Sequence, residues 1–146
     1  MPPRARVRFL NVDLDVRSRE DLTPLAEALE PQVFALHVGR VGRGWMARFE
    51  LSRQPKTADA AIRRLAAAVE RLPARERARW RRASRREFNL GIQAAAEPPA
   101  SEFPIEADTV ALVARLGGRL AVTLYAPPAP RLPGSSRRRG TRSARP

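Results

Sequence analysis

The stretch Leu72–Gln93, LPARERARWRRASRREFNLGIQ, joins an arginine-rich helix directly to a strand, and it organises the chain around it. The helical part surrounds a single tryptophan, Trp80, with arginines. The strand part alternates Phe88, Leu90 and Ile92 with polar residues, which is the period of a half-buried strand. A basic helix and a core strand are therefore expected side by side.

The arginines of this helix, predicted over residues 74–85, fall in two rows when residues are placed at 100° intervals. The first row contains Arg75, Arg79, Arg82 and Arg86, and the second contains Arg77, Arg81 and Arg85. The sector without arginine holds Glu76, Trp80, Ala83 and Ser84, so the helix can bury only a narrow strip around Trp80. We expect Trp80 to build the core and the arginine rows to be optional to the fold.

Four further stretches show the alternation of a strand. Their predicted inward-facing residues are Leu10, Val12, Leu14 and Val16; Phe34, Leu36 and Val38; Trp45, Ala47, Phe49 and Leu51; and Leu120, Val122 and Leu124. Val7 and Phe9 fall in the opposite phase, which predicts a bulge near Phe9–Leu10. Residues 39–44 are glycine-rich and lie between two of these runs, which predicts a hairpin turn and not a phosphate loop.

Helical segments separate these strands. One is expected from Pro24 to Leu29, and another is expected to follow the N-cap residue Thr57 and to end at Pro73. The second places five residues at core-facing spacing: Ile62, Leu65, Ala66, Val69 and Leu72. A last helix is expected to open at Asp108 or Thr109 and to be closed by the pair Gly117–Gly118.

This order of elements predicts an α+β fold over residues 1–126. It contains a ferredoxin-like β-α-β-β-α-β core with an extra C-terminal helix and strand, and an antiparallel or mixed sheet with helices on one face. Residues 127–146, rich in Pro and Arg, have little to bury and predict a disordered basic tail. The residues expected on the open face of the sheet are Asn11, Asp13, Asp15, Arg48, Glu50, Asn89, Gln93 and Thr123.

The net charge of +13 is concentrated in two places. Residues 71–86 hold eight arginines and one acidic residue, and residues 127–146 hold six arginines and no acidic residue. All basic residues except Lys56 are arginines, which also fits a compositional bias. The chain has no cysteine, no signal-peptide pattern and no stretch resembling a membrane span, so a cytoplasmic location without membrane contact is expected.

No stretch carries a catalytic, cofactor-binding or metal-binding signature. His37 is the only histidine, so a zinc site would need carboxylates to complete it. Asp13 and Asp15 lie about 7 Å apart on one strand face, where a cation or an acid–base pair is possible. A solvated face paired across strands with Arg48 or Arg119 is the more ordinary interpretation. We therefore expect no enzyme, no cofactor and no metal.

Several strands together resemble an uncharacterised bacterial family, "domain of unknown function 4279". The residues that carry the resemblance are Asp13–Val16, Trp45–Leu51, Trp80 with Phe88–Gln93, and Thr123–Pro127. The resemblance covers roughly residues 6–127 and implies an α+β fold in a bacterial cytoplasm. It implies no reaction or ligand, although similar domains are suspected of being immunity proteins against toxins.

The leading hypothesis for function is a non-enzymatic binding module, with an immunity-type protein-binding role as one version. The alternative is sequence-nonspecific nucleic-acid binding through the Arg75–Arg86 helix and the basic tail. The partner is unknown, and an acidic protein is one candidate for the arginine helix. The candidate interaction surface contains Arg75, Arg79, Arg82, Arg86, Asp13, Asp15, Arg48, Glu50, Asn89 and Gln93.

Overall fold

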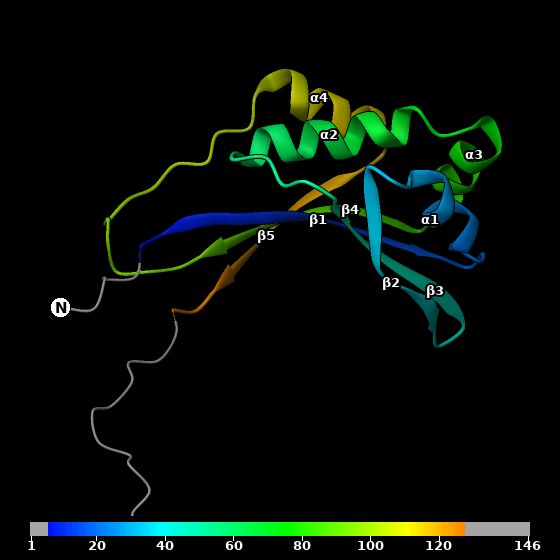
Figure 1. Ribbon diagram of the computed structural model, residues 1–146, viewed down its shortest axis with the longest axis horizontal. Coiled ribbons are helices and arrows are strands. Elements are labelled where there is room, and N and C mark those ends of the chain that lie inside the picture. Colours follow the sequence, from blue (N-terminus) through cyan, green and yellow to red (C-terminus); the bar gives the residue numbers. More distant parts are fainter. Residues whose placement is uncertain (1–5, 128–146) are drawn as a thin grey trace, which may run out of the picture.

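A computed structural model describes residues 6–127, which form one five-stranded mixed sheet with four helices on one face (Figure 1). The elements follow in the order β1 (Arg8–Ser18), α1 (Thr23–Leu29), β2 (Val33–Val41), β3 (Gly44–Leu51), α2 (Ala58–Glu70), α3 (Ala74–Arg82), β4 (Arg85–Gln93), α4 (Ala107–Arg115) and β5 (Arg119–Tyr125). The predicted α+β class is confirmed. From residue 128 on, the predicted tail lies outside the described residues.

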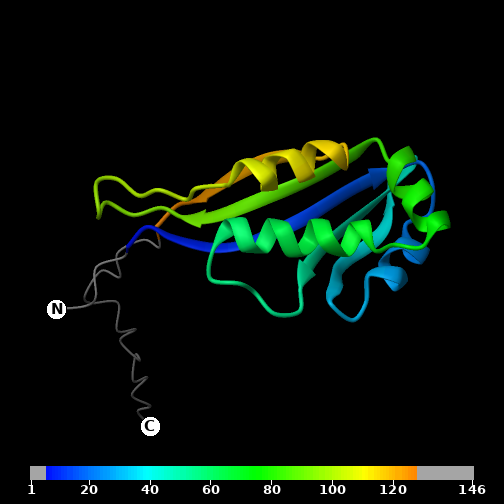
Figure 2. The same ribbon diagram turned by 90° about the horizontal axis from the view of Figure 1, so that it is seen from above.

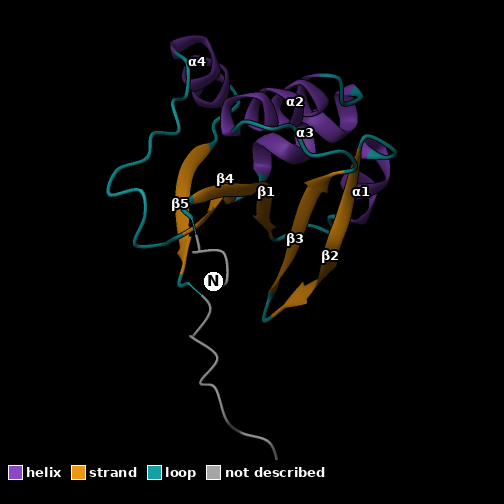
Figure 3. Cartoon of the chain, turned by 60° about the vertical axis from the view of Figure 1, so that its left-hand side comes forward, coloured by secondary structure: helices purple, strands orange, loops and turns teal. Residues whose placement is uncertain are grey.

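The strand order is β2-β3-β1-β4-β5, with β1 at the centre (Figure 3). All neighbours are antiparallel except β4 and β5, which are parallel and make the sheet mixed. The β1–β4 register shifts between Phe9 and Asn11, which confirms the predicted bulge. The glycine-rich segment is the β2–β3 hairpin turn, where Gly42 has a φ of 60°.

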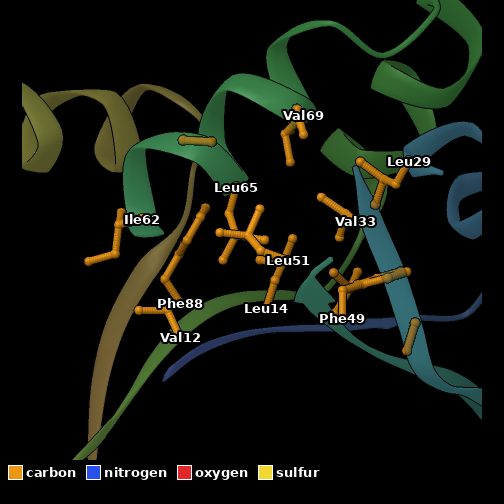
Figure 4. Close-up of a cluster of buried hydrophobic side chains, with 14 of the residues drawn as sticks. Val12, Leu14, Leu29, Val33, Phe49, Leu51, Ile62, Leu65, Val69 and Phe88 are labelled. Carbon is orange, nitrogen blue, oxygen red and sulfur yellow. The ribbon is translucent and has the colours of Figure 1, made fainter. Parts of the chain in front are cut away.

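The core lies between the sheet and α2, which runs along β1 and also packs against α4 (Figures 2 and 4). Thr57 caps α2 by accepting a hydrogen bond from the Ala60 backbone N–H (3.2 Å), as its sequence predicts. All five predicted core-facing residues of this segment are buried. The inward faces of β1, β3 and β4 meet them, with Leu14, Phe49 and Phe88 fully buried.

The prediction for the inward face of β2 is wrong at two residues. Phe34 and Leu36 are exposed, whereas Val33 is buried and Val38 packs against the core. The cause is a register shift between Ala35 and His37, because an extra residue in one strand reverses the facing of the residues that precede it.

The predicted facing of β5 is confirmed, because Leu120, Val122 and Leu124 lie opposite the buried residues Phe88, Leu90 and Ile92 of β4. They are nevertheless not buried, with exposures of 39%, 59% and 67%. β5 is an edge strand, and the preceding helix α4 packs largely against α2 and leaves this strand uncovered. Exposure rises along the strand with distance from the Gly117–Gly118 connection.

The narrow buried strip of α3 is confirmed. Trp80 is 2% exposed, and its indole Nε1–H donates to the Leu116 carbonyl at 2.9 Å. That carbonyl lies at the end of α4, where Gly117 has a φ of 68° and Gly118 N–H donates to the Val113 carbonyl. This C-terminal cap, in the position predicted from the glycine pair, joins α3 to the end of α4.

Among residues 6–127, no helix has both the length and the apolar character needed to cross a membrane.

Candidate functional site

The open face of the sheet gathers four carboxylates from three adjacent strands. The face is the one opposite the helices in Figure 3. Asp13 on β1 lies directly opposite Glu50 on β3, and Asp15 lies opposite Glu87 on β4. We call Asp13, Asp15, Glu50 and Glu87 the acidic block. Directly opposed side chains on one sheet face are about 5 Å apart at Cβ, so these charges act on one another.

One row of the acidic block is neutralised by arginines. Arg48 on β3 donates through Nε to Asp15 Oδ1 (2.7 Å) and through Nη2 to Asp15 Oδ2 (3.2 Å). Arg119 on β5 donates through Nε to Glu87. The cross-strand pairing of Asp15 with Arg48 was predicted, whereas Arg119 pairs with Glu87. These two pairs leave little free charge in their row.

The other row, Asp13 and Glu50, has no ion pair with a cation in the described part of the chain. These carboxylates accept hydrogen bonds from neutral amides: Asn11 Nδ2 donates to Asp13 Oδ1, and Gln54 Nε2 donates to Glu50 Oε1, each at 3.0 Å. Desolvation by burial, followed by repulsion from Glu50, raises the pKa of Asp13 from 3.8 to about 6, although Arg48 opposes the rise. The face therefore holds a carboxylate pair that a cation would stabilise.

Two other predicted residues lie on this face and contact β5. Asn89 lies opposite Asp13 and accepts a hydrogen bond from the Thr123 hydroxyl at 2.8 Å. Gln93 donates through Nε2 to the Tyr125 and Ala126 carbonyls (3.1 and 3.0 Å). Both side chains are thus engaged in holding the edge strand in place.

The arginine helix is less available than its sequence predicts. Arg79 donates to Glu76 Oε2 (2.9 Å), to Glu20 Oε2 (3.3 Å) and to the Asp21 carbonyl (2.8 Å). Arg82 donates twice to Glu20, at 2.5 and 3.0 Å. The hydrogen bond from Arg82 lowers the pKa of Glu20. Arg79 and Arg82 therefore attach α3 to the β1–α1 connection, a contact that the sequence did not predict.

The two ends of the first arginine row differ. Arg86 donates to the carbonyls of Trp80, Arg81 and Gly117, which lie at the C-terminal ends of α3 and α4. Cations are favoured there because helix C-terminal carbonyls carry partial negative charge. Arg75 is exposed and has no ion pair among residues 6–127. The row is therefore not one continuous free surface.

Glu87 belongs to the acidic block but was absent from the predicted surface. Its position, two residues before Asn89 in the same alternating strand, could have placed it on the open face. No group of three or more His, Asp and Glu side chains within residues 6–127 is arranged to hold a metal ion.

Comparison of the chain with protein-family models, with curated proteins and with solved structures finds no match in any of the three. The resemblance to domain of unknown function 4279 stays a prediction.

Proposed function

We propose that this chain is a non-enzymatic binding module that engages a protein partner through the open face of its sheet. The observation that carries the proposal is the Asp13–Glu50 pair, in which two carboxylates lie opposite one another and neither forms an ion pair with a cation of residues 6–127. A lysine or arginine of the partner, placed between them, would replace repulsion with attraction. Binding would lower the pKa of Asp13 and release a proton.

The surroundings of this pair suit a protein surface. In the same cross-strand row, Phe34 lies beside Glu50 and Asn89 lies beside Asp13. Phe34 is 37% exposed, so an aromatic ring is available next to the carboxylates. Aromatic anchors beside a few directional polar groups are typical of protein interfaces. An immunity-type module is one form of this proposal, and the predicted cytoplasmic setting belongs with it.

We also propose that β1-α1-β2-β3-α2-β4 is a ferredoxin-like core, extended by α4 and β5. The support is the order β2-β3-β1-β4 with antiparallel neighbours throughout. The two α-helical crossovers of such a core lie on one face and leave the opposite face for binding.

The test is capture of partners from an extract of the source cells by the immobilised full chain. The double variant Asp13→Asn with Glu50→Gln keeps the shapes of both side chains and removes their charges. The matched control is Arg77→Ala with Arg81→Ala on α3. We expect the wild type and the control to capture one stoichiometric polypeptide. The double variant should capture at least about tenfold less of it, and the wild type should capture less of it below about pH 6, where Asp13 is protonated.

Equal capture by the open-face and control variants would contradict the proposal. The alternative, sequence-nonspecific nucleic-acid binding, is tested with duplex DNA and structured RNA at two salt concentrations, with and without residues 127–146. Binding that weakens steeply with salt and is lost in the Arg77→Ala, Arg81→Ala control would favour the nucleic-acid hypothesis instead.

A further inference from the structure

A pocket lies where the end of β3 meets α2, away from the open face of the sheet. It has a volume of about 520 Å³ and is lined by Gln32, Leu51, Ser52, Arg53, Arg63, Arg64, Ala67 and Arg71. Four of these residues are arginines and none is acidic. The volume lies within the range of about 300–1,000 Å³ of pockets that bind small molecules.

The arginines gather here because of helical spacing. Arg64, Ala67 and Arg71 lie one turn apart along α2 and its C-cap, so they share one side of the helix. Alanine at the middle position leaves room between the two guanidinium groups. Arg53 comes from the β3–α2 connection and faces the same hollow. The core-facing spacing of α2 gives no sign of this arrangement, because Arg64, Ala67 and Arg71 are not among its five core-facing residues.

The charges of this pocket are largely uncompensated. Arg63 is occupied, since it donates to the Thr109 hydroxyl (2.7 Å) and forms an ion pair with Asp59 (3.3 Å). Arg71 donates to the Gln32 side-chain oxygen at 2.7 Å, which orients its guanidinium without neutralising it. Arg53 and Arg64 have no ion pair with any carboxylate in the described range.

We infer that this pocket binds a phosphate monoester group of a small molecule. Three guanidinium groups without a carboxylate suit a dianion whose three terminal oxygens accept several forked hydrogen bonds. A small molecule is favoured over a nucleic-acid backbone because the arginines surround one hollow. Two arginines of α3, Arg79 and Arg82, are bound to Glu76 and Glu20, so they are not free to continue the site as a track along a nucleic-acid backbone. The inference is independent of the proposed function.

The test is isothermal titration calorimetry of the full chain with inorganic phosphate, adenosine monophosphate, glucose 6-phosphate and uncharged adenosine. The pocket variant is Arg53→Ala with Arg64→Ala, because neither side chain has an ion pair among residues 6–127 that its removal would break. The matched control, Arg75→Ala with Arg77→Ala, removes the same charge from exposed positions on α3.

We expect the wild type to bind at least one phosphate monoester and not to bind adenosine. The pocket variant should bind that monoester at least about tenfold more weakly, and the control should bind it within about twofold of the wild-type affinity. Failure of inorganic phosphate and both monoesters to bind would overturn the inference. Equal weakening in both double variants would also overturn it, because that result indicates diffuse attraction of anions. Tighter binding of duplex DNA, with equal loss in both variants, would assign the arginines to a nucleic-acid surface.

Discussion

Asp13 occupies a position in which its own charge is unfavourable. Its carboxyl is half-buried, lies opposite Glu50 and accepts an amide hydrogen bond from Asn11. Asp15 lies two residues along the same strand and also follows an apolar residue, but it accepts hydrogen bonds from the Nε and Nη2 atoms of Arg48. The two aspartates differ in their partners because the strand register places Glu50 opposite Asp13 and Arg48 opposite Asp15.

Asp13→Asn is predicted to stabilise the protein at about pH 8 by about 1 to 3 kcal/mol, with the lower end favoured because the carboxyl is partly exposed. The folded pKa of about 6 lies above the ordinary value of 3.8. The folded protein therefore binds this proton more tightly, and the cost of the charge disappears as pH falls from about 6 to about 4. Urea denaturation at several pH values measures the gain.

The control for this prediction is Asp15→Asn. It removes the carboxylate that binds Arg48 and should lower the free energy of unfolding at about pH 8. A stabilisation by Asp13→Asn that is as large at about pH 4 as at about pH 8 would contradict the assignment of the pKa.

At the scale of elements, α3 is attached to the molecule by charged contacts as well as by Trp80. Arg79→Ala should lower the free energy of unfolding by about 1 to 3 kcal/mol, because it leaves the buried Glu76 without its partner. Arg77→Ala, on the exposed row, should change it by less than about 0.5 kcal/mol. Guanidinium denaturation of both variants makes the comparison, and equal effects would show that the Glu76 contact does not stabilise α3.

β1 and β5 have the same alternation of apolar residues, but helices cover the inward face of β1 and leave that of β5 exposed. Leu14 is fully buried beneath the helices, whereas Leu124 is 67% exposed. Leu14→Ala should therefore cost about 2 to 5 kcal/mol, and Leu124→Ala less than about 0.5 kcal/mol. Thermal unfolding compares the two variants. A large loss of stability in Leu124→Ala would mean that another surface covers β5 in solution.

These elements also show what periodicity can predict. Alternation placed β3, β4 and the part of β1 from Val12 onward correctly, because the residues of their inward faces pack in the core beneath the helices. Before the β1 bulge the prediction is wrong: Phe9, which lies opposite Ile92, packs against the core in place of the predicted Leu10. In β5 the same pattern could not show whether a helix covers the inward face of the strand, because that depends on where α4 packs. In β2 the register shift after Ala35 reversed the facing of Phe34, and no local signal in the sequence marks that shift.

For the whole molecule, net charge describes the surface poorly. The chain has a charge of +13, yet its open sheet face carries the acidic block. The helical wheel predicted the narrow buried strip of α3 around Trp80 correctly. Glu20, however, lies 59 and 62 residues from Arg79 and Arg82, so their pairing could not be predicted. The acidic face was predicted from alternation, whereas the opposition of Asp13 to Glu50 required the register.

The proposed function depends on Asp13 and Glu50 being a carboxylate pair that has no ion-pairing cation among residues 6–127. The most direct test is an NMR titration of the Asp13 side-chain carboxyl carbon in the wild type and in Glu50→Gln. We predict a midpoint of about 6 in the wild type and a lower midpoint in the variant, since repulsion from Glu50 contributes to the raised pKa. A wild-type midpoint near the ordinary 3.8, unchanged by Glu50→Gln, would contradict the claim.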